Sequence, residues 1–188
     1  MSNPTLFLDR DGTINFDSGY IGDPNKIFIY SDVPNNLLRI KNEFGMKLIV
    51  ISNQAGVAKG LMTEDDVKIV NGRIEELLKK SNIAIDEFYY CIHHPDFSSE
   101  EECKCRKPSP LMIFEAQKKH NVDLSKSYFV GDKASDVECG LNAGIKTCLI
   151  LRENNSGELL VLEKQKKIPN FVANNFNEIY EFIKNDLR

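Results

Sequence analysis

The segment TLFLDRDGT, residues 5–13, is an apolar run that ends directly in two aspartates and a glycine. A short apolar run that stops abruptly at polar residues is typical of a strand buried in a parallel sheet, so we expect the first strand at residues 5–9. Gly12 allows a sharp turn, and the amide groups of such a turn can face an anion. The segment therefore predicts a buried strand that opens onto a polar site.

The same strand pattern recurs along the chain and alternates with segments of helical period. Further strands are predicted at residues 46–52, 85–91, 127–132 and 146–152, and helices at 32–45, 63–80, 109–121 and 135–143. From residue 157 on we expect a helix, a short strand near residues 170–173 and a last helix. This alternation predicts the α/β class: a doubly wound, Rossmann-like parallel sheet with helices on both faces.

Two of the predicted helices carry clear terminal signals. Asp32 or Ser31 is expected to cap the helix at 32–45, and Gly45 to end it. Thr63 and Asp66 have the spacing of a capping box, which predicts a helix start at this point.

Length and charge restrict the function classes. A chain of 188 residues is expected to form one domain, residues 1–188, and its net charge of −4 argues against a nucleic-acid-binding surface. The N-terminus lacks the pattern of a signal peptide, and no apolar run is long enough to span a membrane. We therefore expect a cytoplasmic monomer without nucleic-acid or membrane partners.

Polar residues follow three of the predicted strands. In open α/β sheets, ligands bind beyond the carboxyl ends of the strands. The residues at these ends are expected to form one shared site; they are Asp9 and Asp11, then Ser52, Asn53 and Gln54, then Gly131, Asp132 and Lys133.

The carboxylates of this site suggest phosphoryl chemistry. Asp9 and Asp11 would repel each other, so one needs a metal ion or a raised pKa. An ionised carboxylate can attack phosphorus, and a protonated one can donate to the leaving oxygen. Asp132 and Asp136 add oxygen ligands of the kind that Mg²⁺ prefers, and Lys107 and Lys133 could balance phosphoryl charge. The alternatives are a solvated turn at the first pair, a helix cap at the second and a solvent-facing Lys133.

Residues 91–108, CIHHPDFSSEEECKCRKP, contain three of the five cysteines. Cys91, His93, Cys103 and Cys105 offer a Cys₃His set suited to tetrahedral Zn²⁺, and a site closed by four protein ligands is structural. A metal would hold a polar loop that cannot bury a core of its own. We expect His94 to lie beside the ligands or at the surface. A disulfide between two of these cysteines after oxidation is the alternative.

Four segments in order, LFLDRDGT, VISNQ, CRKP and VGDKASD, resemble the motifs of the haloacid dehalogenase (HAD) superfamily of phosphatases. The resemblance implies that Asp9 is the nucleophile and Asp11 the general acid and base. It implies that Ser52 and Lys107 bind the phosphoryl group. The Mg²⁺ ligands would be Asp9, the backbone carbonyl of Asp11 and Asp132, with Asp136 in the outer coordination shell.

The pattern C-x-H…C-x-C-R-K-P is similar to that of the D-glycero-D-manno-heptose-1,7-bisphosphate 7-phosphatases and the histidinol-phosphate phosphatases, whose structural zinc loop stands in for a large cap domain. The resemblance implies a Mg²⁺-dependent sugar phosphatase of carbohydrate metabolism, in heptose biosynthesis, without a large cap domain. Histidinol phosphate hydrolysis and a catalytically idle zinc-dependent binding module are the alternatives. Substrate contacts are expected from Asp17, Ser18, Gly19, Tyr20, Asn53, Gln54, Arg106 and Lys133, although Arg106 has an alternative as a plain surface charge.

Overall fold

A computed structural model describes residues 2–152, 155 and 157–188. Its sheet has six parallel strands in the order β3-β2-β1-β4-β5-β6. In chain order the strands are β1 Thr5–Leu8, β2 Lys47–Asn53, β3 Glu87–Cys91, β4 Tyr128–Gly131, β5 Lys146–Ile150 and β6 Phe171–Ala173. The predicted parallel α/β fold is therefore confirmed.

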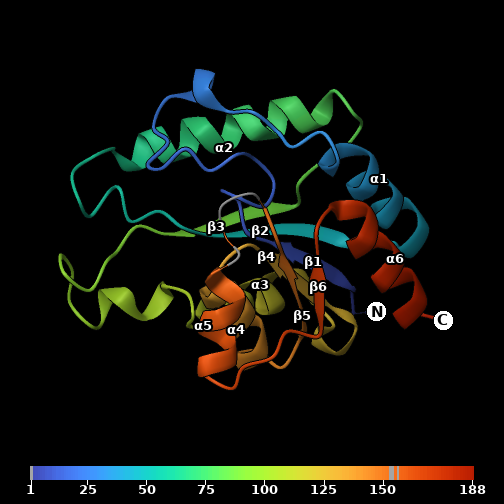
Figure 1. Ribbon diagram of the computed structural model, residues 1–188. Helices are drawn as coiled ribbons and strands as arrows, with labels where there is room; N and C mark the ends of the chain where they lie inside the picture. The colour runs from blue at the N-terminus through green and yellow to red at the C-terminus, as the bar shows by residue number, and fades with distance from the viewer. Residues whose placement is uncertain (1, 153–154, 156) are drawn as a thin grey trace.

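Helices cover both faces of the sheet (Figure 1). Those that share one apolar cluster with the first face are α1 Val33–Phe44, α2 Glu64–Lys79 and α6 Phe176–Asp186. On the opposite face lie α3 Leu111–His120, α4 Ala134–Asn142 and α5 Gly157–Lys164. Leu6 and Leu8 pack against the first group and Phe7 against the second, so β1 is buried on both sides. Short 3₁₀ turns occupy η1 Pro24–Lys26, η2 Glu102–Cys105 and η3 Leu124–Lys126.

The helix ends follow the sequence signals with one exception. Thr63 and Asp66 form the predicted capping box of α2, and Gly45 ends α1 with a φ of 63°. Asp32 precedes α1, but its side chain makes no capping bond to that helix. Its carboxylate instead accepts a 2.8 Å hydrogen bond from the backbone amide of Phe176 and forms an ion pair with Arg152 at 3.2 Å. The predicted cap thus stabilises a different helix, because chain folding brings the start of α6 beside it.

The strand order indicates at which point along the sheet a ligand is expected to bind. The chain runs outward from β1 through β2 to β3, then returns to β4 on the other side of β1. The crevice beyond the carboxyl ends of β1 and β4 is thus the point where the direction of winding changes, which is where open α/β sheets bind ligands. No helix among the described residues is long and apolar enough to cross a membrane.

Candidate active site

A cavity of about 390 Å³ opens beyond the carboxyl ends of the central strands. Its wall contains most of the residues that the sequence singled out: Asp9, Asp11, Asp17, Gly19, Tyr20, Ser52, Asn53, Gln54, Arg106, Lys107, Lys133 and Asp136. Ser18 does not line it, and Asp132 lies in the neighbouring depression behind Gly12. Lys59 and Ser135, which the sequence analysis did not select, also line the cavity.

Asp9 lies at the floor of the site beside one buried cation. Its carboxylate accepts a hydrogen bond from the Lys107 ammonium at 2.5 Å, and the residue is 5% exposed. Burial raises the pKa of Asp9 to about 6, although Lys107 acts in the opposite direction. At neutral pH most of the carboxylate is therefore ionised and can act as a nucleophile.

Lys107 is held in place at both its side chain and its backbone. Its ammonium contacts Asp9, Asp136 at 2.7 Å and the carbonyl of Ile51 at 2.7 Å. Burial would lower the pKa of Lys107, but Asp136 and Asp9 together raise it above its usual value. The Asn53 side chain accepts from the amide of Lys107 at 3.0 Å and donates to its carbonyl at 3.1 Å. Asn53 therefore positions Lys107, and it also lines the cavity, so the expected substrate contact stays a proposal.

Three carboxylates converge next to this lysine. Asp9, Asp132 and Asp136 each offer an oxygen within 4.8 Å of the others, and among the described residues they form the cluster that could hold a metal ion. One oxygen of Asp132 is buried without a hydrogen-bond partner there. Burial and the charge of Asp9 raise the pKa of Asp132 to about 9. A buried, unpartnered carboxylate oxygen in an acidic cluster suits a hard divalent cation, so the residues fit Mg²⁺.

Gly12 packs directly against the Asp132 carboxylate of this cluster. Gly12 has a φ of +84°, and a Cβ at this position would lie 2.3 Å from the Asp132 carboxylate. A side chain here would therefore displace the carboxylate or force the turn open. The glycine that the sequence assigned to a sharp turn is also required by this close approach.

Without divalent metal, we expect the stability of the protein to fall as the pH rises. Because the folded-state pKa of Asp132 is raised from 3.8 to about 9, its favourable contribution is complete below about pH 4 and is lost as the pH rises through about 9. In EDTA, the Tm should fall by roughly 3 °C or more between about pH 6 and pH 9. For a chain of this length, a loss of about 1 kcal/mol in the free energy of unfolding lowers the Tm by roughly 2–4 °C.

Thermal unfolding followed by circular dichroism, with and without Mg²⁺, measures this dependence. The Asp132→Asn variant should show a flatter profile, and Mg²⁺ should restore the Tm of the unmodified protein at high pH. A profile for Asp132→Asn as steep as that of the unmodified protein would contradict the assignment.

Asp11 lies on the cavity wall in a different electrostatic environment from Asp9. Burial would raise its pKa, but the Arg10 guanidinium and hydrogen bonds from Arg10, Asn15 and Gln54 outweigh that effect and lower the pKa below its ordinary value. Gln54 also donates to the Ser52 hydroxyl at 2.7 Å. The Gln54 side chain is thus hydrogen-bonded within the site, and its expected substrate contact stays a proposal.

Cationic side chains occupy the rim of the cavity. Lys133 pairs with Asp17 at 3.0 Å, and Lys59 donates to the Tyr20 hydroxyl at 2.6 Å. Arg106 donates to the backbone carbonyl of His93 at 3.2 Å and also faces the cavity. The floor and the rim therefore each carry a cationic side chain, and the acidic cluster contacts the cation of the floor, Lys107.

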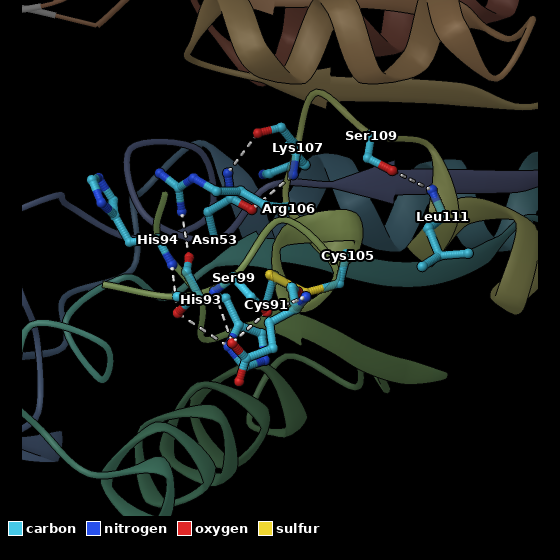
Figure 2. Close-up of a disulfide and its surroundings, with 12 residues drawn as sticks. Asn53, Cys91, His93, His94, Ser99, Cys105, Arg106, Lys107, Ser109 and Leu111 are labelled. Atoms are coloured by element: carbon cyan, nitrogen blue, oxygen red, sulfur yellow. Dashed lines mark hydrogen bonds between the residues drawn. A yellow bond between two sulfur atoms is a disulfide. The ribbon is translucent and has the colours of Figure 1, made fainter. Parts of the chain in front are cut away.

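The cysteine loop differs from the zinc site expected from the sequence. Cys91 and Cys105 form a disulfide (Figure 2), with their Cα atoms 5.5 Å apart. Cys103 is a free thiol. The His93 ring lies 3.4 Å from the Ser98 hydroxyl. The Cys₃His set is therefore not assembled around a metal position in this form, and the oxidised alternative is the one that the structure contains.

The disulfide nevertheless lies where the expected anchor was placed. Cys105 immediately precedes Arg106 and Lys107. Cys91 is the last residue of β3 and pairs with Asn53, the last residue of β2. Figure 2 shows the cross-link beside the segment that carries the two cations. Joining the loop to the sheet edge at this point fixes the start of that segment.

Comparison with known proteins gives a consistent result. Residues 104–179 match the HAD-hydrolase-like family model. The chain is 40% identical to a D-glycero-D-manno-heptose-1,7-bisphosphate 7-phosphatase of Chlorobaculum tepidum, over 97% of this chain and 93% of that protein. It is 37% identical to the D-glycero-beta-D-manno-heptose-1,7-bisphosphate 7-phosphatase of Escherichia coli strain K12, over 80% of each chain.

Solved structures share the fold. A D,D-heptose 1,7-bisphosphate phosphatase from B. bronchiseptica, solved with magnesium and phosphate, superposes with a TM-score of 0.82 at 24% identity, covering 97% of this chain and 99% of that one. An HAD-like phosphatase from Mesorhizobium loti gives a TM-score of 0.75 at 32% identity over 90% of each chain. The chain is therefore a phosphoric monoester hydrolase that belongs to the D-glycero-D-manno-heptose-1,7-bisphosphate 7-phosphatase family of HAD-like hydrolases.

Proposed function

We propose that the protein removes the 7-phosphate of D-glycero-D-manno-heptose 1,7-bisphosphate, the substrate named for its relatives. One observation carries this proposal beyond the family: the cavity has positive charge at two separate places, Lys107 on the floor and Arg106 and Lys59 at the rim. A substrate with two phosphates needs two such places, because each phosphate must be matched by its own cation. Histidinol phosphate, with one phosphate and an amine, would leave the rim cations unmatched.

The chemistry starts at Asp9. Its ionised carboxylate attacks phosphorus and forms an aspartyl-phosphate, while Asp11 protonates the departing sugar oxygen. Water then cleaves the intermediate, and Asp11 accepts the proton from that water. Lys107 and Ser52 bind the phosphoryl oxygens throughout, since both lie on the cavity wall beside Asp9.

Asp11 needs a proton before it can act as the acid. Its contacts favour the ionised form in the free protein, and that form suits the second step. A bound phosphate adds negative charge beside it, and nearby negative charge raises the pKa of a carboxyl group. Substrate binding thus supplies the condition for the first step.

The metal ligands are proposed from the same cluster. Asp9, Asp132 and the backbone carbonyl of Asp11 would hold Mg²⁺, which when bound neutralises charge on the transferring phosphoryl group. Asp136 suits an outer position, since its two oxygens already accept from Lys107 at 2.7 Å and from the amide of Lys133 at 3.0 Å. The expected substrate contacts that line the cavity remain proposals, with Ser18 outside its wall; they are Asp17, Gly19, Tyr20, Asn53, Gln54, Arg106 and Lys133.

Phosphate release from a substrate panel tests the assignment. With Mg²⁺, we expect the highest kcat/KM for a heptose 1,7-bisphosphate anomer, with heptose 1-phosphate as the organic product. Arg106→Ala should raise KM for the bisphosphate about tenfold or more, corresponding to the loss of one charge-assisted contact. Its effect on a monophosphate should be smaller. Faster hydrolysis of histidinol phosphate, or release of the 1-phosphate, would contradict the proposal.

For the cysteine loop, we propose that Cys91, His93, Cys103 and Cys105 bind structural Zn²⁺ once the disulfide is reduced. Two sulfurs are already adjacent, and Cys103 lies in the same short turn as Cys105. Protein reduced by a dithiol should bind about one Zn²⁺ per chain, whereas oxidised protein should bind none, since a closed site needs all four donors. Elemental analysis after gel filtration measures this. Cys103→Ser should bind no zinc even when reduced, and Cys148→Ser is its matched control because Cys148 is buried outside the loop. Reduced protein that binds no zinc would refute the site.

The remaining expectations are proposals of smaller scope. Residues 1–188 would act as one domain and a monomer, and the protein would work in the cytoplasm, where a reduced zinc loop is favoured over a disulfide.

A further inference from the structure

Arg10, the residue between the two aspartates of the first motif, is almost completely buried. It is 1% exposed and ranks among the largest fully buried side chains. An arginine stays charged in proteins, and a buried charge is costly unless it is paired and hydrogen-bonded. The sequence analysis gave Arg10 no role, so its partners indicate what it does.

The guanidinium joins three segments of the fold. It donates to the Asp11 carboxylate from Nε at 3.1 Å and from Nη2 at 2.8 Å. Nη2 also donates to Gln54 Oε1 at 2.8 Å, and Nη1 donates to Asn71 Oδ1 at 2.9 Å. Asn71 lies on α2 and is 7% exposed. Arg10 therefore links the loop after β1 and the end of β2 to a helix that does not line the cavity.

These contacts determine where the Asp11 carboxylate lies. Gln54 Nε2 donates to Asp11 Oδ2 at 2.9 Å, and Asn15 Nδ2 donates to Oδ1 at 2.9 Å. Both oxygens thus have fixed partners, although the Asp11 side chain still keeps 14% of its surface exposed. Arg10 itself does not line the cavity, so it reaches the reacting atoms only through Asp11.

We propose that Arg10, anchored by Asn71 of α2, is a positioning residue for Asp11, holding its carboxylate where it serves the oxygen of the leaving sugar. The inference rests on the proposed role of Asp11 as the proton donor. A purely structural role, in which the buried ion pair only stabilises the fold, predicts a different kinetic result.

Leaving-group dependence separates the two roles. Attack by Asp9 is common to all substrates, but only a poor leaving group such as a sugar alkoxide needs a proton from the acid. The value of kcat/KM covers the steps through the first irreversible one. We therefore compare kcat/KM for the sugar phosphate with kcat/KM for p-nitrophenyl phosphate, whose leaving group is stable as an anion.

The proposal predicts selective losses. Asn71→Ala should lower kcat/KM for the sugar phosphate about tenfold, a fraction of the roughly 10²–10⁴ that a general acid contributes. Arg10→Lys, which keeps the charge but loses the planar fork, should cost more. Both variants should change kcat/KM for p-nitrophenyl phosphate by less than about twofold, since that step needs no acid.

A matched control is available on the neighbouring helix. Asn36 of α1 is also 7% exposed, and its side chain donates to the backbone carbonyl of Asp32. Asn36→Ala should leave the ratio between the two substrates unchanged. Thermal unfolding of every variant separates losses of stability from losses of position. If Arg10→Lys does not fold, Asn71→Ala provides the result.

Asp11→Asn distinguishes failure of the inference from failure of the proposed function. It should show the selective loss in full, and adding Arg10→Lys to it should cost nothing further for the sugar phosphate. Equal losses for both substrates in Asp11→Asn would overturn the acid role itself. Selective loss in Asp11→Asn, together with equal or absent losses in Asn71→Ala and Arg10→Lys, would overturn the positioning role of Arg10.

Discussion

Asp9→Asn is expected to abolish turnover while leaving the fold intact. The amide has nearly the shape of the carboxylate but cannot act as the nucleophile, and loss of a nucleophile costs at least about 10⁴-fold in kcat. Removal of a charge from the acidic cluster should not lower the Tm, because Asp9, Asp132 and Asp136 lie within 4.8 Å of one another and repel. Phosphate release and thermal unfolding, measured on the same preparation, check both halves of this prediction.

The matched control for Asp9→Asn is Asp65→Asn. Asp65 lies in the first turn of α2, and its side chain is 82% exposed. This variant makes the same chemical change away from the cavity and should retain full activity. Substantial phosphate release by Asp9→Asn would contradict the mechanism, because Asp136, which also contacts Lys107, already accepts from the amide of Lys133 and is assigned no nucleophilic role.

Lys107→Met is expected to cost both activity and stability. The Lys107 side chain is 2% exposed, and its ammonium forms ion pairs with both Asp9 and Asp136. Breaking a buried ion pair by removing one partner costs about 3–5 kcal/mol, since the remaining charge is left without compensation. Chemical denaturation should therefore show a clear loss in the free energy of unfolding, and phosphate release should fall because the phosphoryl charge loses its partner.

Two further variants sharpen this result. Lys104→Met alters an exposed lysine of the same loop that pairs with Glu101, and an exposed pair is worth about 0–1 kcal/mol, so its effect should be small. Adding Asp136→Asn to Lys107→Met removes one uncompensated charge and should recover part of the stability but not the activity. Full stability in Lys107→Met would contradict the assigned role of the buried pair.

The sheet could be predicted from the sequence because its signals are local. Each buried strand is a short apolar run, and β1 extends over Thr5–Leu8 within the predicted 5–9. The α2 start could be predicted from Thr63 and Asp66, whose capping box involves only neighbouring residues. Asp32 was different: its carboxylate bonds the start of α6, a contact that depends on the tertiary fold.

In the site, too, local sequence signals predicted which residues take part, whereas contacts made by the tertiary fold were not predictable. Asp9, Asp11 and Lys107 could be selected because they stand at strand ends or in motifs, and the cavity brings them together. Asn53 and Gln54 line the cavity, but their hydrogen-bond partners were not predictable, since the geometry around Lys107 and Asp11 decides them. The role of Asn71 had no signal beyond its burial on α2.

For the cysteine segment, the sequence could not decide between two kinds of cross-link. Spacing alone is compatible both with a Cys₃His zinc site and with a disulfide between two of its members. The sequence predicted a zinc anchor beside Arg106 and Lys107, with a disulfide as the alternative, but which of the two forms depends on the redox and metal conditions. The structure contains the Cys91–Cys105 bond.

Trapping the covalent intermediate tests the central claim most directly. Protein quenched with acid during turnover of heptose 1,7-bisphosphate, then digested and mapped by mass spectrometry, should carry one phosphoryl group on the peptide that contains Asp9. Fragmentation should place the group on Asp9, and the Asp9→Asn variant should carry none. A phosphoryl group on Asp11, or turnover without any phosphorylated peptide in a quench fast enough to capture it, would contradict the account.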